Sequence, residues 1–334
     1  AGFDIVSVGE LGRVRKAGGD VKKVVFSGVG KRADELEAAL KAGILMFNVE
    51  SAEELELLDQ VGRRVGKRAP FALRVNPDVD AKTHRYIATG LKTSKFGVPF
   101  EEAVALYKWS RRRPGLEARG VDCHIGSQLT DARPVKEAIT RVAGLYSELK
   151  SQGFGLTHLD VGGGLGVTYS KEKPPDVSTY AKAVIDSTKH LGTTLVLEPG
   201  RVLVGNAGVL LTRVLFNKRT PAKHFVIVDA GMNDLMRPAL YEAHHDIVAV
   251  KPRRGAKTTV EIVGPVCEST DVLGHGRSMA PLKQGDLLAI RTAGAYGMSM
   301  ASTYNSRQRP AEVLVDGDDY RVVRKREALE ALWQ

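Results

Sequence analysis

The chain has 334 residues, of which 43% are hydrophobic and 26% are charged, a composition that is ordinary for a globular protein with a sizeable core. No apolar run approaches the roughly 20 residues needed to span a bilayer, so we do not expect a membrane protein. The formal net charge of +10 is spread over scattered lysines and arginines, which favours an anionic small-molecule ligand over a nucleic acid.

The two cysteines, Cys123 and Cys267, lie far apart in the sequence and have no zinc-type spacing. We therefore expect neither a disulfide framework nor a metal site, and a cytoplasmic location is the default. The N-terminus has no signal-peptide pattern, because no basic segment leads into an apolar run. It starts on a turn and a strand without a methionine, so we expect that the chain begins inside a domain.

Short β-rich runs alternate with longer amphipathic patterns through residue 198. The predicted strands are Phe3–Val8, Val24–Val29, Met46–Glu50, Phe71–Asn76, Gly120–Ile125, Leu159–Val161 and Thr194–Glu198. The predicted helices are Ala33–Ala42, Ala52–Val65, Phe100–Arg111, Arg133–Gln152 and Val177–Leu191. This alternation predicts a parallel sheet with crossover helices.

Polar side chains follow most of these strands. They are Ser7 and Glu10, Ser27, Asn48 and Glu50, Arg74 and Asn76, His124 and Ser127, and Glu198 and Arg201. A TIM-type (β/α)8 barrel places its active site at the carboxyl ends of its strands, so we expect one site there. Seven βα units are recognisable, and numbering the last two strands seven and eight would put the first unit upstream of Ala1.

The pattern changes after Asn206, where long helical patterns largely disappear. Apolar and β-branched residues alternate in short runs that are separated by Gly and Asp turns. The predicted strands lie within 208–216, 225–228, 258–263, 286–291, 311–315 and 320–323. We therefore predict a barrel domain over residues 1–207 and an antiparallel β-barrel or β-sandwich domain over residues 208–334.

Three consecutive glycines, Gly162, Gly163 and Gly164, directly follow the predicted strand at 159–161. Bare glycine N–H groups can wrap an anion, and barrel enzymes often bind phosphate after strands seven and eight. Together with Gly200 and Arg201, the loop predicts the phosphate end of a phosphorylated cofactor. A flexible hinge or tight turn is the alternative explanation of the glycines.

Two further strand-end residues fit an aromatic cofactor. His124 could stack on a ring or donate a hydrogen bond, and Glu198 could face a ring nitrogen. The alternatives are a hydrogen-bonded bystander for the histidine and an ordinary Glu-Pro-Gly turn for the glutamate.

A series of motifs in fixed order resembles the pyridoxal-phosphate-dependent decarboxylases whose N-terminal barrel precedes a C-terminal β domain. The motifs cover essentially the whole chain and are FDIVSVGEL, VVFSGVGK, FNVES, LRVNP, SKFG, HIGSQ, LDVGGGLG, EPGR, VDAGMNDLMRPALY, CESTD and GAYG. Within that family the resemblance is closest to the diaminopimelate decarboxylases, which release carbon dioxide from meso-diaminopimelate and yield L-lysine.

The resemblance implies a role for each matched residue. The cofactor phosphate would be held by the backbone at Gly162, Gly163, Gly164, Gly200 and Arg201, with the Tyr296 hydroxyl and Ser127. His124 would lie against the pyridine ring, Glu198 would keep the ring nitrogen protonated, and Asp4 would lie near the reacting end.

The substrate of these enzymes carries a second amino-acid group far from the reacting carbon. Arg201, Arg237 and Tyr241, with Tyr296 nearby, would bind its carboxylate, and Glu268 would bind its ammonium. Cys267 would be the general acid that protonates the carbon after carbon dioxide leaves, although a buried apolar cysteine is the simpler alternative. In this family Cys267 and Glu268 would enter the neighbouring subunit's site, which implies a homodimer with shared active sites.

The chain departs from the family most clearly in that no motif matches the lysine that forms a Schiff base with the cofactor. We expect this lysine upstream of Ala1. The alternatives are a non-catalytic homologue without a covalently held cofactor, or a decarboxylase of another basic amino acid such as ornithine, arginine or carboxynorspermidine. A far end that is purely cationic fits poorly beside Arg237.

Overall fold

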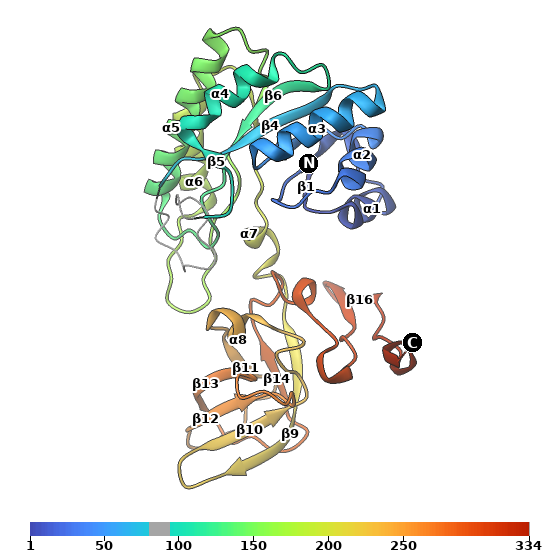
Figure 1. Ribbon diagram of the computed structural model, residues 1–334. Coiled ribbons are helices and arrows are strands. Elements are labelled where there is room, and N and C mark those ends of the chain that lie inside the picture. Colours follow the sequence, from blue (N-terminus) through green and yellow to red (C-terminus); the bar gives the residue numbers. More distant parts are fainter. Residues whose placement is uncertain (80–93, 334) are drawn as a thin grey trace. The chain divides into compact units, whose positions relative to one another are not determined.

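The computed structural model describes residues 1–79 and 94–333 (Figure 1). The chain divides into two compact units, and each is described by itself. The first contains residues 1–166 and 174–199, and the second contains residues 167–173 and 200–334.

The first unit is built on a parallel sheet in which each strand pairs with the next one in the chain. Its order is β1 (Phe3–Ile5), β2 (Val24–Phe26), β3 (Met46–Val49), β4 (Ala69–Asn76), β6 (Leu116–Asp122), β7 (His158–Asp160) and β8 (Thr194–Val196), with the short β5 (Val98–Pro99) beside β4. Between successive strands run α1 (Val8–Lys16), α2 (Ala33–Ala42), α3 (Ala52–Val65), α4 (Phe100–Ser110), α5 (Ala132–Ser151) and α6 (Val177–Thr188). This βα alternation confirms the predicted barrel-type α/β architecture.

The sheet curls on itself. Val25, Met46 and Ala72 from three adjacent strands form one buried cluster, and Val196 from β8 packs against it. Because strands from distant positions in the sheet share this cluster, their carboxyl ends converge on one region. The end strands β1 and β8 are not paired with each other in the part of the chain that the structure describes.

Capping residues fix the helix ends. The Ser7 hydroxyl accepts a hydrogen bond from the Glu10 N–H and starts α1, so the predicted strand at 3–8 is shorter than expected and a helix follows it at once. Ser51 caps α3 in the same way, and Gly66 ends it in the left-handed conformation.

The second unit contains a six-stranded sheet in the order β11 (Ile247–Ala249), β14 (Leu287–Ile290), β9 (Leu210–Arg219), β10 (His224–Val228), β12 (Thr258–Val263) and β13 (Val272–Met279). Its pairings are antiparallel except that of β10 with β12, which is parallel. A separate hairpin joins β15 (Glu312–Asp316) and β16 (Asp319–Arg324). The mostly antiparallel β domain is thus confirmed, whereas β11 and β13 had no sequence prediction.

Short helices complete both units. They are α7 (Arg201–Val204), α8 (Arg237–Tyr241) and the 3-10 turns η1 (Val21–Lys23), η2 (Met298–Met300), η3 (Tyr304–Ser306) and η4 (Leu329–Trp333). Among the described residues, every helix is too short or too polar to reach across a bilayer.

Candidate active site

The residues predicted from the sequence fall into groups within the two units. The first unit holds Asp4, His124, Ser127, Gly162, Gly163, Gly164 and Glu198, and the second holds Gly200, Arg201, Arg237, Tyr241, Cys267, Glu268 and Tyr296.

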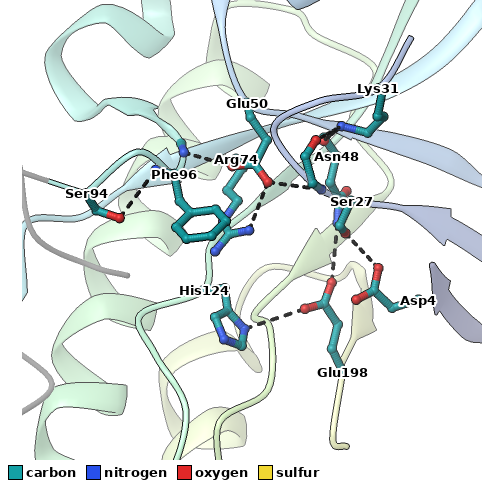
Figure 2. Close-up of polar contacts among 12 residues, drawn as sticks. Asp4, Ser27, Lys31, Asn48, Glu50, Arg74, Ser94, Phe96, His124 and Glu198 are labelled. Carbon is teal, nitrogen blue, oxygen red and sulfur yellow. Dashed lines mark hydrogen bonds and ion pairs between the residues drawn. The ribbon is translucent and has the colours of Figure 1, made fainter. Parts of the chain in front are cut away.

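Polar side chains from the carboxyl ends of four strands meet around Asn48 (Figure 2). Its Nδ2 donates to Ser27 Oγ and to Asp160 Oδ2 at 3.2 Å each, and lies 3.4 Å from Glu198 Oε1. The Ser27 hydroxyl in turn donates to Asp4 Oδ1 at 2.7 Å. The predicted residues Asp4 and Glu198 are therefore linked through two side chains that had been noted only as strand ends.

Glu198 lies in an acidic environment. Carboxylate oxygens of Asp122, Asp160 and Glu198 lie within 4.8 Å of one another. Burial is the main cause that raises the pKa of Glu198 well above its ordinary value, and the neighbouring Asp160 adds to it. The same two causes raise the pKa of Asp122. The raised pKa values mean that these carboxyls bind protons more strongly than exposed ones, which suits Glu198 to a basic group placed beside it.

His124 is neutral. Its Nδ1 accepts a hydrogen bond from the Gly163 N–H at 3.1 Å, and the same atom lies 3.6 Å from Glu198 Oε2. Burial lowers the pKa of His124 to about 3. The proton of the ring therefore resides on Nε2, and the contact with Glu198 is not an ion pair. The ring presents an uncharged aromatic face between the ends of β6 and β8.

The glycine loop packs closely against neighbouring backbone. A Cβ on Gly162 would lie 2.6 Å from the Cys123 carbonyl oxygen, and one on Gly163 would lie 2.1 Å from that of Glu198. Gly162 and Gly164 also have φ values of +67° and +105°. Only glycine therefore lets the segments that follow β6, β7 and β8 pack this closely against one another. A flexible hinge would not require such close packing.

Two of the three glycine N–H groups are used inside the protein, contrary to the expectation that the loop leaves them bare. Gly162 N–H donates to Asp160 Oδ1 at 3.0 Å, and Gly163 N–H donates to His124. Ser127 belongs to a loop that lies along the same segment, since Leu129 N–H donates to the Gly164 carbonyl at 2.8 Å. Phosphate contacts from this region therefore depend on the part of the loop beyond Gly163.

A buried charged network supports the site and was not assigned a role from the sequence. Glu50 Oε1 accepts from Arg74 Nη1 at 3.0 Å and from the Gly28 N–H at 3.1 Å, and Oε2 accepts from the Gly97 N–H at 2.9 Å (Figure 2). Glu50 thereby ties together the loops after β2, β3 and β4. Arg74, whose charge acts on Glu198, is held in place by this contact. The sequence offered one signal for this network, namely that a glutamate and an arginine lie at the ends of adjacent predicted strands.

In the second unit, two of the predicted arginines share one aromatic side chain. Arg201 Nη1 donates to the Tyr169 hydroxyl at 2.7 Å, and the Arg237 guanidinium lies over the Tyr169 ring at 4.2 Å from its centroid. Arg201 also lies over the Tyr296 ring at 4.8 Å. The structure therefore brings together Arg201, Arg237 and Tyr296, and adds Tyr169, which sequence reasoning missed.

The remaining predicted residues of this unit are placed by short local structures. Gly200 precedes α7 as its N-cap residue, and Tyr241 is the last residue of α8, the helix that begins at Arg237. Cys267 and Glu268 form a separate exposed pair, in which the Cys267 N–H donates to Asn305 Oδ1 at 2.9 Å. Glu268 Oε1 accepts a hydrogen bond from the Tyr304 hydroxyl. The alternative of a buried apolar cysteine is thus wrong for Cys267 in this chain.

Comparison with known proteins matches these features to one family. The family described as "Pyridoxal-dependent decarboxylase, pyridoxal binding domain" matches residues 1–205. The diaminopimelate decarboxylase of Neisseria meningitidis serogroup A is 56% identical over 333 residues, which cover 99% of this chain and 81% of the relative. That of Vibrio cholerae is 54% identical over 334 residues, covering 100% of this chain and 80% of the relative.

Solved structures that resemble this chain belong to related decarboxylases. The diaminopimelate decarboxylase of Helicobacter pylori complexed with L-lysine matches with a TM-score of 0.96 and 46% identity, covering 100% of this chain and 83% of that one. The lysine decarboxylase of Selenomonas ruminantium matches with a TM-score of 0.81 and 27% identity, covering 91% of this chain and 77% of that one. The chain therefore belongs to the pyridoxal-dependent decarboxylases and, within them, to the diaminopimelate decarboxylase family.

Proposed function

We infer that the protein catalyses the pyridoxal-phosphate-dependent decarboxylation of meso-diaminopimelate to L-lysine and carbon dioxide. The observation that carries this inference is the contact of Glu198, a buried carboxyl with a raised pKa, with the neutral imidazole of His124, whose Nδ1 lies 3.6 Å from Glu198 Oε2 at the carboxyl ends of barrel strands. Its relatives at 56% and 54% identity bear the name of this enzyme.

The residues of the first unit fit pyridoxal phosphate. A carboxyl whose pKa is raised by burial binds a proton strongly, so Glu198 suits a pyridine nitrogen that must stay protonated. The uncharged His124 ring suits one face of a flat heterocycle. Ser127 and Gly164 would help to hold its phosphate, and Asp4 would lie near its reacting end.

When bound, the cofactor supplies an electron sink for the electrons of the broken carbon–carboxylate bond. The chain contributes the proton at the ring nitrogen through Glu198, whose position depends on Asn48 and on the Glu198 N–H that donates to the Gly162 carbonyl at 2.9 Å. Arg74 opposes the surrounding carboxyls and limits the rise in the pKa of Glu198.

The arginines of the second unit would select the substrate by its second carboxylate. Arg237 is 6% exposed, and its buried Nε has no hydrogen-bond partner within residues 1–79 and 94–333. A buried cation with an unused donor is costly unless an anion arrives to bind it. Arg201 and Tyr241 would complete this carboxylate site, which a substrate with only an amine at that end would leave unpaired.

Glu268 would bind the ammonium next to that carboxylate, and the Cys267 thiol would deliver a proton to the carbon that has lost carbon dioxide. Both residues are exposed and are fixed by hydrogen bonds to Asn305 and Tyr304, which suits groups that serve a neighbouring subunit. We therefore propose a homodimer with shared active sites, working in the cytoplasm on a small-molecule substrate.

A substrate panel tests this function. The holoenzyme is assayed with meso-diaminopimelate, L-lysine, L-ornithine, L-arginine and carboxynorspermidine, and bound cofactor is followed by its visible absorbance. We expect kcat/KM for meso-diaminopimelate to exceed that of each other compound by at least about 100-fold, since the others leave Arg237 unpaired. Preferred turnover of any compound whose far end carries only a cationic group overturns the assignment, as does cofactor binding without turnover.

A further inference from the structure

A buried histidine contacts the arginine that we assign to the substrate's second carboxylate. His245 is 0% exposed, and its Nε2 lies 2.8 Å from Arg237 Nη1. Its Nδ1 lies 2.9 Å from the Arg291 carbonyl oxygen. Both ring nitrogens therefore have polar partners within the second unit.

The partners determine where the ring carries its proton. A guanidinium nitrogen can only donate, so Nε2 must accept from Arg237. The single ring proton therefore resides on Nδ1 and is donated to the Arg291 carbonyl. Burial, reinforced by the charge of Arg237, lowers the pKa of His245 to about 4, which keeps this form at neutral pH.

The backbone around His245 is equally fixed. The Arg291 N–H donates to the Asp246 carbonyl at 2.8 Å, which extends the ladder formed by β11 and β14. A sheet edge therefore anchors the imidazole, and the imidazole in turn anchors one corner of the Arg237 guanidinium.

Tyr169 holds the same arginine from another side. Its ring packs edge-on against His245 at 5.2 Å between centroids, with an interplanar angle of 76°. The Arg237 guanidinium lies over the ring at 4.2 Å, and the hydroxyl accepts from Arg201. Tyr169 thus keeps two cations near each other, and the charge of Arg201 acts on Arg237. Bringing like charges together is unfavourable unless an anion binds near both.

We propose that His245 and Tyr169 are positioning residues, which aim Arg237 at the carboxylate that the substrate retains and that L-lysine still carries. This inference rests on the proposed function and deepens it. His245 fixes Nη1 of Arg237, so that the buried and unpartnered Nε remains available to the ligand. A histidine with only a packing role would not need its acceptor nitrogen on this arginine.

Two amide variants separate a positioning role of His245 from a packing role. In His245→Gln, the side-chain oxygen reaches the place of Nε2 and keeps an acceptor for Arg237. In His245→Asn, the shorter side chain reaches only the place of Nδ1 and keeps the bond to the Arg291 carbonyl. His275→Gln serves as the control, because that histidine is exposed and pairs with Glu261.

The readouts are KM and kcat for meso-diaminopimelate, and the inhibition constants of L-lysine and of cadaverine, which is the same diamine without a carboxylate. We expect His245→Asn to raise the L-lysine constant and KM by roughly 10- to 100-fold, the range for a hydrogen bond to a charged group. The cadaverine constant should stay unchanged, and His245→Gln should recover most of the loss. Tyr169→Phe, which removes the hydroxyl that accepts from Arg201 Nη1, should also weaken L-lysine selectively.

Equal weakening of L-lysine and cadaverine in His245→Asn, or a Gln variant worse than the Asn variant, overturns the proposal. So does wild-type behaviour of both variants. These outcomes differ from a failure of the proposed function, in which the wild-type holoenzyme itself would not decarboxylate meso-diaminopimelate. Tyr169→Phe keeps the ring under Arg237 and serves if an amide variant does not fold: wild-type constants, or equal weakening of L-lysine and cadaverine, in this variant also overturn the proposal.

Discussion

Replacing Gly163 by alanine is expected to push the glycine loop away from Glu198. An ideal Cβ at this position would lie 2.1 Å from the Glu198 carbonyl oxygen and 2.8 Å from its carbonyl carbon. Both atoms belong to the backbone, so no side-chain rotation can relieve the clash. The two segments must move apart.

The size of the effect follows from what the movement breaks. The Glu198 N–H donates to the Gly162 carbonyl at 2.9 Å, and the Gly163 N–H donates to His124 at 3.1 Å. Overpacking of this kind typically lowers the free energy of unfolding by about 1–3 kcal/mol. Loss of alignment of Glu198 and His124 should also raise the dissociation constant of pyridoxal phosphate by about 10-fold or more.

The assay combines urea unfolding with a cofactor titration followed by absorbance. Gly155→Ala is the matched control, since an added Cβ there meets nothing within 4 Å. We expect the control to match the wild type in both measurements. If Gly163→Ala binds the cofactor as tightly as Gly155→Ala and unfolds at the same urea concentration, the contact between the loop and Glu198 does not build the site.

Three other changes give separate tests. Glu198→Gln keeps the shape but cannot share a proton with the ring nitrogen, so kcat should fall by about 100-fold or more while cofactor absorbance persists; unchanged kcat would refute the role. In Lys31→Met, the buried Glu54 carboxylate loses the Lys31 ammonium that lies 2.6 Å from it, so the free energy of unfolding in urea should fall by about 3–5 kcal/mol. Lys41→Met, which breaks an exposed ion pair with Glu37, should change this free energy little. A hydrogen bond from Arg253 lowers the pKa of Asp286 from 3.8 to about 2, so its stabilising effect is complete above about pH 4 and is lost as the pH falls through 2. The urea midpoints of wild type and Asp286→Asn should therefore differ at pH 5 and converge towards pH 2, and a constant difference would contradict this.

Amphipathic periodicity predicted α2 to α6 of the first unit and missed α1, whose start at Val8 had been assigned to the first strand. The bounds of α2 and α3 match the predicted 33–42 and 52–65, since Gly43 and Gly66 end them in the left-handed conformation. The first strand was predicted too long because Ser7 acts as a helix cap, an effect that short-range alternation does not reveal.

The second unit was harder to predict. β13 contains Gly274 and Gly276 and has no clear alternation, and β11 has only three residues, so both escaped notice. Likewise, residues 167–173 directly follow the glycine loop but belong to the second unit. This assignment depends on tertiary contacts, which the sequence pattern does not reveal. The predicted boundary at residue 207 stays a prediction.

The site residues also differ in whether a local motif or only the tertiary structure reveals them. Motif resemblance identified Glu198, His124 and Arg237, whose side chains lie in the polar groups described above. Tyr169 and His245 were missed, because their contacts with Arg237 join residues 68 and 8 positions apart through the fold rather than through any motif. The roles of the predicted residues stay predictions until the variants are measured.

The product of the reaction tests the central claim most directly. The holoenzyme is incubated with meso-diaminopimelate, and carbon dioxide and L-lysine are measured together against the same mixture without pyridoxal phosphate. The account predicts equal amounts of the two products and dependence on the cofactor. Carbon dioxide without L-lysine, or no release of carbon dioxide from a protein that has bound its cofactor, would contradict it.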